Sequence, residues 1–266
     1  MNEDPFAEFK EQQRQSWSNF SPTAMFTTPV AGHLVRFAEI VPGQSVLDVG
    51  TGTGVVAITA ARNGAKVSGL DLTPALVEEA IRNAYVADCE VQFEVGDAEA
   101  LPYPDATFDV VLSQFGHMFA PNPRRAVAEM RRVLKPGGRI AFATWPPEHL
   151  VGKMFSFLGA RLPPPPPGAA PPAQWGNPGV IAERLAESFA APHFQRGTMM
   201  FAALSLAHYR SFLEETIGPF RALVQHLRQE VDQLAAVRAE FESMVRPFYR
   251  DNVVHQDYLL TRAQAI

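Results

Sequence analysis

The sequence predicts an α/β protein in which a mostly parallel sheet is covered by helices on both faces. Short apolar stretches alternate with helical stretches five times between residues 45 and 145. Most of these stretches are apolar with little polar alternation, which is typical of strands buried on both faces. The chain has 266 residues, of which 47% are hydrophobic and 19% charged, so it is long and apolar enough to bury a core of its own.

The first 42 residues are predicted to form an N-terminal helical arm. Residues 1–22 are polar with aromatic residues at intervals, and apolar residues recur at helical spacing from 23 to 39. Pro42 and Gly43 end this second helix.

Residues 43–146 are predicted to form the core, in which strands and helices alternate. Thr73 suits the N-cap of a helix and Pro74 suits its first turn. The pair Gly137-Gly138 ends the last helix of this region. The expected strands are residues 45–50, 66–72, 90–98, 108–115 and 139–145, and the other expected helices are residues 55–63 and 123–134.

Residues 147–252 are predicted to form a proline-rich loop followed by a helical lid. Ten of the 23 prolines lie in residues 146–179, which indicates either an irregular connector or a loop over the carboxyl edge of the sheet. An apolar stripe along 220–245 is either ordinary core packing or the underside of a lid. Helices are expected at 179–189, 206–216 and 220–245, a core strand near 195–201, and a final core strand within 253–266, at 254–263.

The glycine-rich loop after the first strand is the most informative motif. Its pattern, from Asp48 to Gly54, is D-x-G-x-G-x-G. A dinucleotide fingerprint starting at Gly50 would need glycine at position 55, where this chain has Val55. A carboxylate two residues before the first glycine suits a ligand with a positive amino group better than a pyrophosphate. Alone, the motif is also compatible with a plain turn between a strand and a helix.

Acidic residues stand at the ends of the first three predicted strands. Asp71 lies at the end of the second strand and can accept both hydroxyls of a ribose. Asp97 lies at the end of the third strand and can accept an adenine amine. Each acid alone is as often a solvated or capping residue. Together with Asp48, they outline a ligand with an ammonium group, a ribose and an adenine.

These segments resemble the class I S-adenosylmethionine-dependent methyltransferases, in the branch that includes the ubiquinone and menaquinone C-methyltransferases and many small-molecule methyltransferases. The resemblance is strong over residues 43–146 and weak elsewhere. The segments that carry it are VLDVGTGTG (46–54), GLDL (69–72), GDAEALPYPDATFDVV (96–111) and EMRRVLKPGGRIAFATW (129–145).

The resemblance implies a Rossmann-like, seven-stranded sheet whose last strand is antiparallel, with a helical lid insertion. It also implies S-adenosylmethionine as the cofactor and S-adenosylhomocysteine as the product. Asp71 would then bind the ribose, Asp97 with Ala98 the adenine, and the segment 50–52 the methionine moiety. The predicted cofactor-binding residues are Trp17, Asp48, Gly50, Thr51, Gly52, Asp71, Leu72, Asp97, Ala98 and Gln114.

The acceptor site is predicted less sharply. His117 follows the fourth strand and is the candidate catalytic residue, since a histidine can act as a general base near neutral pH. A hydrogen-bonded histidine at the rim of the site is the alternative. Trp145, Trp175 and Tyr209 are expected to line an apolar acceptor pocket with His117, although each could equally be ordinary core.

Charge and composition exclude several classes of partner. The net charge is −5 and the pI is near 5.8, and the D/N/S-P-P-Y/F/W signature of nucleic-acid amino-methyltransferases is absent after the fourth strand, so no nucleic-acid partner is expected. No apolar run is long enough to span a membrane and no histidine set has metal-site spacing. With Cys89 as the single cysteine, a cytoplasmic location is the simplest expectation. No sequence feature indicates an oligomeric state.

The sequence thus predicts a methyltransferase that acts on an O, N or C atom of a small, partly apolar molecule. Two alternatives stay open at this stage. The chain could bind S-adenosylmethionine without transferring its methyl group, or it could be a dinucleotide-dependent oxidoreductase, against which Val55 counts.

Overall fold

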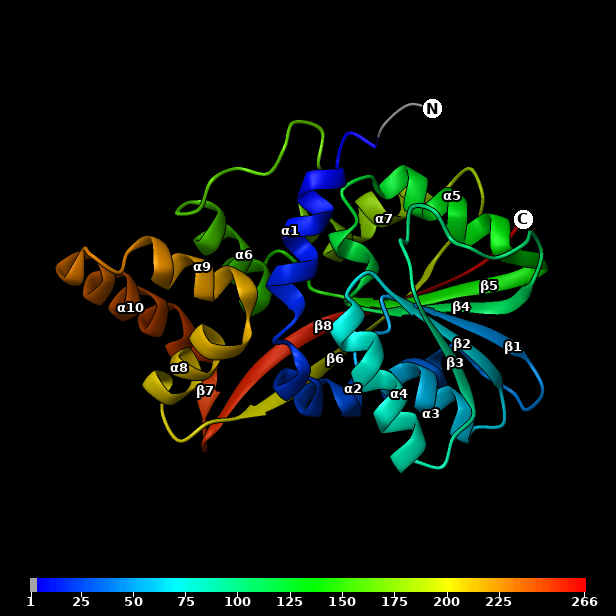
Figure 1. Ribbon diagram of the computed structural model, residues 1–266, viewed down its shortest axis with the longest axis horizontal. Helices are drawn as coiled ribbons and strands as arrows, with labels where there is room; N and C mark the ends of the chain where they lie inside the picture. Colours follow the sequence, from blue (N-terminus) through cyan, green and yellow to red (C-terminus); the bar gives the residue numbers. More distant parts are fainter. Residues whose placement is uncertain (1–3) are drawn as a thin grey trace.

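The computed structural model describes residues 4–266 and contains one mixed sheet (Figure 1). Five neighbouring strands are parallel in the order β3-β2-β1-β4-β5, and β8 follows, antiparallel to both β5 and β6. The two-residue strand β7 pairs with β8 outside this path. The strands are β1 (Ser45–Val49), β2 (Lys66–Asp71), β3 (Val91–Val95), β4 (Phe108–Gln114), β5 (Leu134–Thr144), β6 (His193–Ala202), β7 (Tyr249–Arg250) and β8 (Val253–Gln264).

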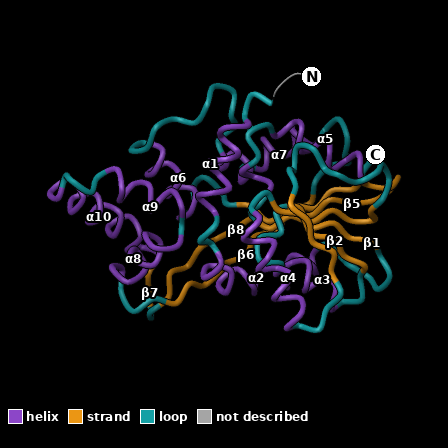
Figure 2. Tube along the Cα trace, viewed as in Figure 1, coloured by secondary structure: helices purple, strands orange, loops and turns teal. Residues whose placement is uncertain are grey.

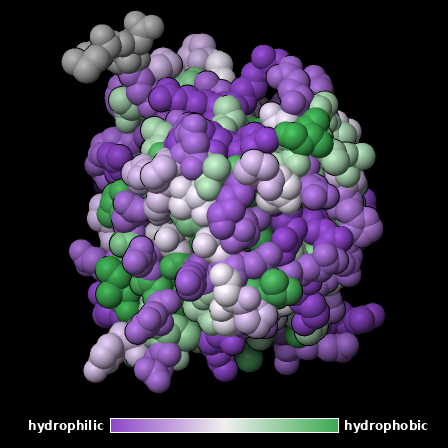
Figure 3. All heavy atoms as spheres, turned by 90° about the vertical axis from the view of Figure 1, so that its right-hand side faces the viewer, coloured by the Kyte–Doolittle hydropathy of each residue, from purple (hydrophilic) through white to green (hydrophobic). Residues whose placement is uncertain are grey.

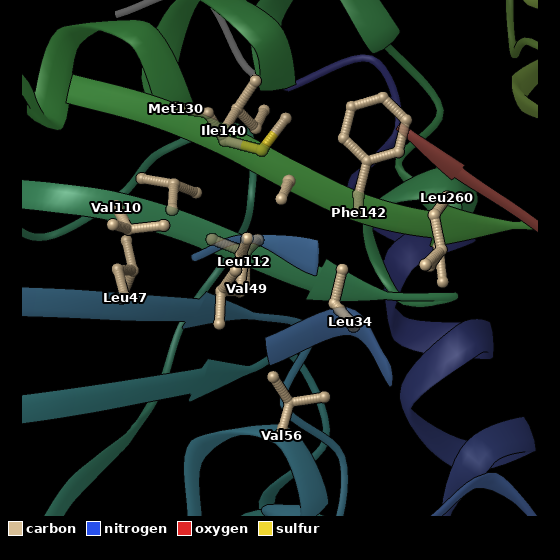
Figure 4. Packing of buried hydrophobic residues seen from close by; sticks show 14 of the residues in the cluster. Leu34, Leu47, Val49, Val56, Val110, Leu112, Met130, Ile140, Phe142 and Leu260 are labelled. Atoms are coloured by element: carbon tan, nitrogen blue, oxygen red, sulfur yellow. The ribbon is translucent and has the colours of Figure 1, made fainter. Parts of the chain in front are cut away.

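Helices cover both faces of the parallel part of the sheet, as the sequence predicts. Three helices lie on one face: α2 (Ala24–Phe37), α3 (Val55–Arg62) and α4 (Pro74–Val86). The helices α5 (Pro123–Val133) and α7 (Pro178–Leu185) lie on the other. Figure 4 shows the resulting core, in which side chains of β1, β4 and β5 lie between Met130 of α5 and Val56 of α3. The prediction of an α/β sheet with an antiparallel last strand is confirmed.

The parallel register brings the carboxyl ends of the strands to one edge. Asp48 in β1 is level with Gly69 in β2, and Asp71 in β2 is level with Val95 in β3. The backbone N–H groups of Gly50 and Thr51 both donate to the carbonyl oxygen of Leu70, at 2.8 and 2.9 Å. The loops after β1 and β2 are therefore held side by side, so side chains far apart in sequence meet at this edge.

Four helices gather beyond the carboxyl edge and form a second apolar cluster (Figure 2). They are α6 (Leu150–Gly159), α8 (Leu206–Thr216), α9 (Gly218–His226) and α10 (Val231–Val245), and we call them the lid. Helix α1 (Ala7–Trp17) of the N-terminal arm lies between the lid and the parallel strands in Figure 1. The other short helices are 3-10 turns at Ser21–Thr23, His117–Phe119, Pro172–Gly176 and Arg246–Phe248.

Two predictions about the lid region are wrong. The stretch 146–179 is not irregular throughout, because α6 lies within it and buries Leu150, Met154 and Leu158. The expected helix over 220–245 is broken into α9 and α10. A straight helix of that length would extend about 39 Å, whereas the break lets Phe241 of α10 join the cluster that contains Leu223 of α9.

Two smaller differences concern strand ends. Strand β5 begins at Leu134 rather than near residue 139, because Leu134 already pairs with Phe108 before an irregularity in the ladder. Strand β3 is confined to Val91–Val95 at the edge of the sheet. The division of the chain into arm, core, lid and final strand stays a prediction.

The face of the molecule away from the lid is mostly hydrophilic. In Figure 3, apolar residues occur there in small, separate groups, as is ordinary for a protein surface. Among the helices of residues 4–266, none combines the length and the apolar character needed to span a bilayer.

Candidate functional site

A cavity of about 240 Å³ opens at the carboxyl edge of the sheet, between the strand ends and the lid. Ligands of open α/β sheets bind at this edge. Residues from α1, the loops after β1 to β4, the lid and strands β6 and β8 line it. All ten predicted cofactor-binding residues are among them: Trp17, Asp48, Gly50, Thr51, Gly52, Asp71, Leu72, Asp97, Ala98 and Gln114.

The glycine loop leaves room for a ligand at the backbone. Gly50 and Gly52 have φ angles of 67° and 55°, which L-residues with a side chain rarely adopt. A Cβ atom on Gly50 would lie 2.7 Å from the Cα of Gly116, so the loops after β1 and β4 touch there. A Cβ atom on Gly52 would meet no protein atom within 4 Å, although Gly52 lines the cavity. The second glycine therefore faces open space that a ligand can fill.

Asp48 is fully buried at the end of β1 and is only partly satisfied. Its Oδ2 accepts hydrogen bonds from the Thr51 hydroxyl at 2.6 Å and from the Ala57 N–H at 3.1 Å. Its Oδ1 has no partner within residues 4–266. Burial raises the pKa of Asp48 to about 7, and the negative charge of Asp71 adds to this effect.

Gln114 presents a second unsatisfied acceptor at the end of β4, the strand next to β1. Its Nε2 donates to the carbonyl oxygen of Thr27 at 3.1 Å, and its Oε1 is buried without a partner in the described part of the chain. Unpaired buried acceptors are uncommon in folded proteins. An ammonium group, which has three N–H donors, would satisfy the free oxygens of both Asp48 and Gln114, so these residues fit the amino end of the predicted cofactor.

Asp71 joins two loops at the end of β2. Its Oδ2 accepts from the Gly52 N–H and its Oδ1 from the Thr73 N–H, both at 2.8 Å. Burial raises the pKa of this carboxyl group, and the two backbone N–H groups oppose that shift. Each oxygen can accept a further hydrogen bond, so the carboxylate retains capacity for two hydroxyl groups.

Lys10 of α1 is a site residue that sequence reasoning missed. Its Nζ lies 2.6 Å from Asp4, 2.7 Å from Asp97 and 2.8 Å from Glu99, and only 6% of its side chain is exposed. The three carboxylates lie close enough together to suggest a metal site, but the ammonium group of Lys10 lies among them. A single lysine in a polar helix carries no pattern that would have revealed this contact.

Aromatic residues form the rest of the wall, and one predicted residue is not among them. Trp17 packs on Phe119 with ring centroids 4.7 Å apart, and Trp145 stacks on Phe115 at 3.9 Å. Tyr209 of α8 also lines the cavity. Trp175 does not line the cavity. It is packed behind the cavity wall, with 1% of its surface exposed. The correction follows from topology, because Trp175 lies in a 3-10 turn that contacts α7 and the strand β5.

His117 lines the cavity but is poorly suited to act as a general base. Only 1% of the residue is exposed, and neither ring nitrogen has a partner in the part of the chain that the structure describes. Burial lowers its pKa to about 3, with a smaller contribution from the charge of Arg184. The ring packs against Phe142 and Trp175, each with centroids 4.6 Å away. The structure thus offers a neutral histidine in an apolar wall instead of the expected base.

Comparisons with known proteins agree with this geometry. A family model described as "Methyltransferase domain" matches residues 47–142, the segment with the glycine loop and the strand-end acids. An uncharacterized protein of Mycobacterium tuberculosis is 31% identical over 255 residues, which cover 94% of this chain and 93% of that protein. A demethylmenaquinone methyltransferase of Thermus thermophilus is 33% identical over 169 residues, which cover 62% of this chain and 76% of that enzyme.

Solved structures share the fold at lower identity. The YcgJ protein of Bacillus subtilis has a TM-score of 0.59 at 22% identity and covers 88% of this chain and 97% of that one. The [4+2]-cyclase SpnF has a TM-score of 0.52 at 21% identity and covers 89% and 80%. Given the domain match and the similarity to the Thermus enzyme, the chain belongs to the class I methyltransferases, which use S-adenosylmethionine as their cofactor.

Proposed function

We propose that this protein transfers a methyl group from S-adenosylmethionine to an O, N or C atom of a small, partly apolar molecule. One observation carries the proposal: a single cavity joins the glycine loop and the strand-end acids to an apolar end that the lid forms. A cofactor held at the strand ends would therefore face an acceptor held by the lid, within one continuous cavity.

The residues divide by what they can hold. We assign the ribose hydroxyls to Asp71, the adenine to Asp97 with Ala98, and the ammonium group to Asp48 and Gln114. When bound, the cofactor supplies an activated methyl group for an in-line displacement. The protein contributes mainly proximity and alignment to such a reaction. The lid and α1 also line this cavity, which would limit the access of water to a bound cofactor.

The direct test is turnover with purified protein. Methyl transfer from isotope-labelled S-adenosylmethionine to a panel of small hydroxylated, aminated and carbon-nucleophile aromatics should give a labelled product and one equivalent of S-adenosylhomocysteine. Asp71→Ala, which damages the cofactor site, is the negative control. Tight cofactor binding without transfer to any extract-derived or synthetic acceptor would favour the alternative of a binding protein without transferase activity.

That alternative stays open because the fold alone does not determine the reaction. The solved structures that share this fold include the [4+2]-cyclase SpnF. The other alternative, a dinucleotide-dependent oxidoreductase, is tested by calorimetry with NAD and with S-adenosylhomocysteine.

A larger residue at position 52 should block the cofactor. Gly52→Val combines a β-branched side chain with a φ of 55°, so it should lower stability by about 1–2 kcal/mol in addition to abolishing binding. Gly52→Asn separates the two effects, because asparagine tolerates this backbone conformation while its side chain enters the cavity. We expect Gly52→Asn to retain most of the melting temperature and lose cofactor binding in calorimetry. Wild-type affinity in Gly52→Asn would contradict the proposed position of the ligand.

Cofactor affinity should rise with pH because of Asp48. Its pKa is raised to about 7, so the carboxyl group is mostly protonated at pH 6 and must ionise to pair with an ammonium group. We expect affinity to be about tenfold weaker at pH 6 than at pH 8, with proton release on binding. Calorimetry in buffers of different ionisation enthalpy measures this release, and Asp48→Asn should abolish it.

The same shift has a consequence for the unliganded protein. Because the folded-state pKa of Asp48 lies above the usual value of 3.8, the folded state holds this proton more tightly than the unfolded chain does. Its contribution to stability is therefore present at low pH and lost as pH rises from about 4 through 7. If cofactor affinity did not rise with pH while stability fell, the ammonium group of the cofactor would not be bound by Asp48.

A further inference from the structure

The cavity separates charged from uncharged walls. Lys10, Asp48, Asp71 and Asp97 supply charged side chains, and all of them belong to α1 or to the loops and strand ends on the cofactor side. The walls from the lid, β6 and β8 carry no charge among the described residues that line them. These lining residues are Val151, Met154, Phe155, Leu158, Met199, Phe201, Tyr209, Leu213, Ile217, Pro219, Phe220 and Gln256.

Two polar side chains stand in this apolar end. Tyr209 of α8 is fully buried, and Gln256 of β8 is 4% exposed. The Nε2 of Gln256 donates a hydrogen bond to the Tyr209 hydroxyl at 2.8 Å. The two residues therefore form a pair that joins the lid to the sheet, although 47 positions separate them in the sequence.

The Tyr209 hydroxyl still has its own hydrogen to donate. Among the described residues, the Tyr209 hydroxyl donates a hydrogen bond to the sulfur of Met154 at 3.8 Å, and a thioether is a weak hydrogen-bond acceptor. Burial raises the pKa of Tyr209, so the phenol stays protonated and acts as a donor rather than a base. A buried hydroxyl without a good acceptor is unfavourable unless another group supplies one.

We infer that Tyr209, held by Gln256, recognises an uncharged, largely apolar methyl acceptor. A carbonyl-type oxygen of this molecule would accept a hydrogen bond that the Tyr209 hydroxyl donates. This inference rests on the proposed methyl transfer and narrows its substrate class. The aromatic side chains Phe155, Phe201 and Phe220 suit a flat apolar body. A carboxylate or ammonium group in this end would be desolvated without a counter-charge from the wall, which disfavours charged acceptors.

The experiment uses three probes of similar size on protein saturated with S-adenosylhomocysteine: 4-hydroxyacetophenone, 4-ethylphenol and 4-hydroxybenzoate. All three carry a phenol group. Opposite the phenol, the first has a ketone oxygen, the second has an ethyl group without oxygen, and the third has a carboxylate. Binding is measured by calorimetry and by quenching of tryptophan fluorescence. We expect the ketone to bind about tenfold more tightly than 4-ethylphenol, the effect of one neutral hydrogen bond, and the benzoate to bind more weakly than either.

Tyr209→Phe distinguishes recognition from a structural role. It should erase the preference for the ketone over 4-ethylphenol and leave the affinity for S-adenosylhomocysteine unchanged. Tyr258→Phe is the matched control, because Tyr258 is also buried and hydrogen-bonded, to His33 at 2.7 Å, but does not line the cavity. This variant should lose some thermal stability and keep the preference for the ketone.

Each of three results would overturn the inference, and the first two concern the wild-type protein. The first is tighter binding of the benzoate than of the ketone, and the second is binding of none of the neutral probes at millimolar concentration. The third is a ketone preference that survives in Tyr209→Phe. Failure of the proposed function itself looks different: wild-type protein would then fail to bind S-adenosylhomocysteine, or would bind it and transfer no methyl group to any acceptor. If the protein bound the cofactor and transferred the methyl group to a charged acceptor, this result would contradict the present inference and leave the proposed function standing.

Discussion

Asp71→Ala is expected to weaken S-adenosylmethionine binding at least tenfold. In our assignment, this carboxylate would hold two ribose hydroxyls, and a hydrogen bond to a charged group contributes about 1.5–3 kcal/mol. The substitution also removes the acceptor for the N–H groups of Gly52 and Thr73, so the two loops beside the cavity lose a common anchor. Calorimetric titration with S-adenosylmethionine and with S-adenosylhomocysteine measures the loss.

Two control variants sharpen this prediction. Asp71→Asn keeps one oxygen acceptor without the charge, so its affinity should lie between those of the wild type and the alanine variant. Glu78→Ala removes an exposed acid from α4 and should bind like the wild type. Circular dichroism must show that Asp71→Ala remains folded. If the folded variant bound the cofactor normally, the ribose would be held by other residues.

Lys10→Met is expected to destabilise the protein by about 3 kcal/mol, near the low end for breaking a buried ion pair. Of the three carboxylates around the Lys10 ammonium, the side chain of Glu99 is 1% exposed, whereas those of Asp4 and Asp97 are 30% and 25% exposed. Water can therefore stabilise the charges of Asp4 and Asp97 better than the charge of Glu99. The variant would leave Glu99 buried without its cation. Urea unfolding measures the free energy, and cofactor affinity should fall as well because Asp97 lies in the proposed adenine site.

A double-mutant cycle separates the charge from the packing. Lys10→Met combined with Glu99→Gln should recover part of the lost stability, because the uncompensated negative charge is then removed. Lys66→Met, at the exposed beginning of β2, is the control for loss of a lysine and should change stability by less than about 0.5 kcal/mol. A Lys10→Met variant as stable as this control would show that the ion network contributes nothing.

The core could be predicted because its signals are local. A glycine loop, an acid at a strand end or a Thr-Pro helix start is written in a few adjacent residues, and parallel pairing then places the strand ends together. Asp48, Asp71 and Asp97 can therefore be recognised as a group from the sequence. They line one cavity as the strand order requires.

The rest depended on long-range packing that short patterns do not contain. Lys10 meets Asp97 and Glu99 across 87 and 89 positions, and nothing in its neighbourhood in the sequence indicates those partners. His117 follows β4 as expected, yet its environment is set by Trp175, which comes from the proline-rich stretch. The break between α9 and α10 follows from the shape of the lid cluster, since the apolar periodicity continues through it.

The sheet order also constrains how the chain can fold during synthesis. Strand β8 follows the other strands in sequence, yet it lies between β5 and β6, and β6 pairs with it along its whole length. Until residues 253–264 leave the ribosome, β6 has no neighbour in this sheet and β5 exposes an open edge. The parallel half of the sheet can assemble early, because its strands and helices are neighbours in the sequence. The lid cluster forms later, because it includes Val254 of β8 and β8 pairs with β6 across a long intervening segment. Gln256 lies on β8, so the apolar end of the cavity cannot be complete before residues 253–264 have been synthesised.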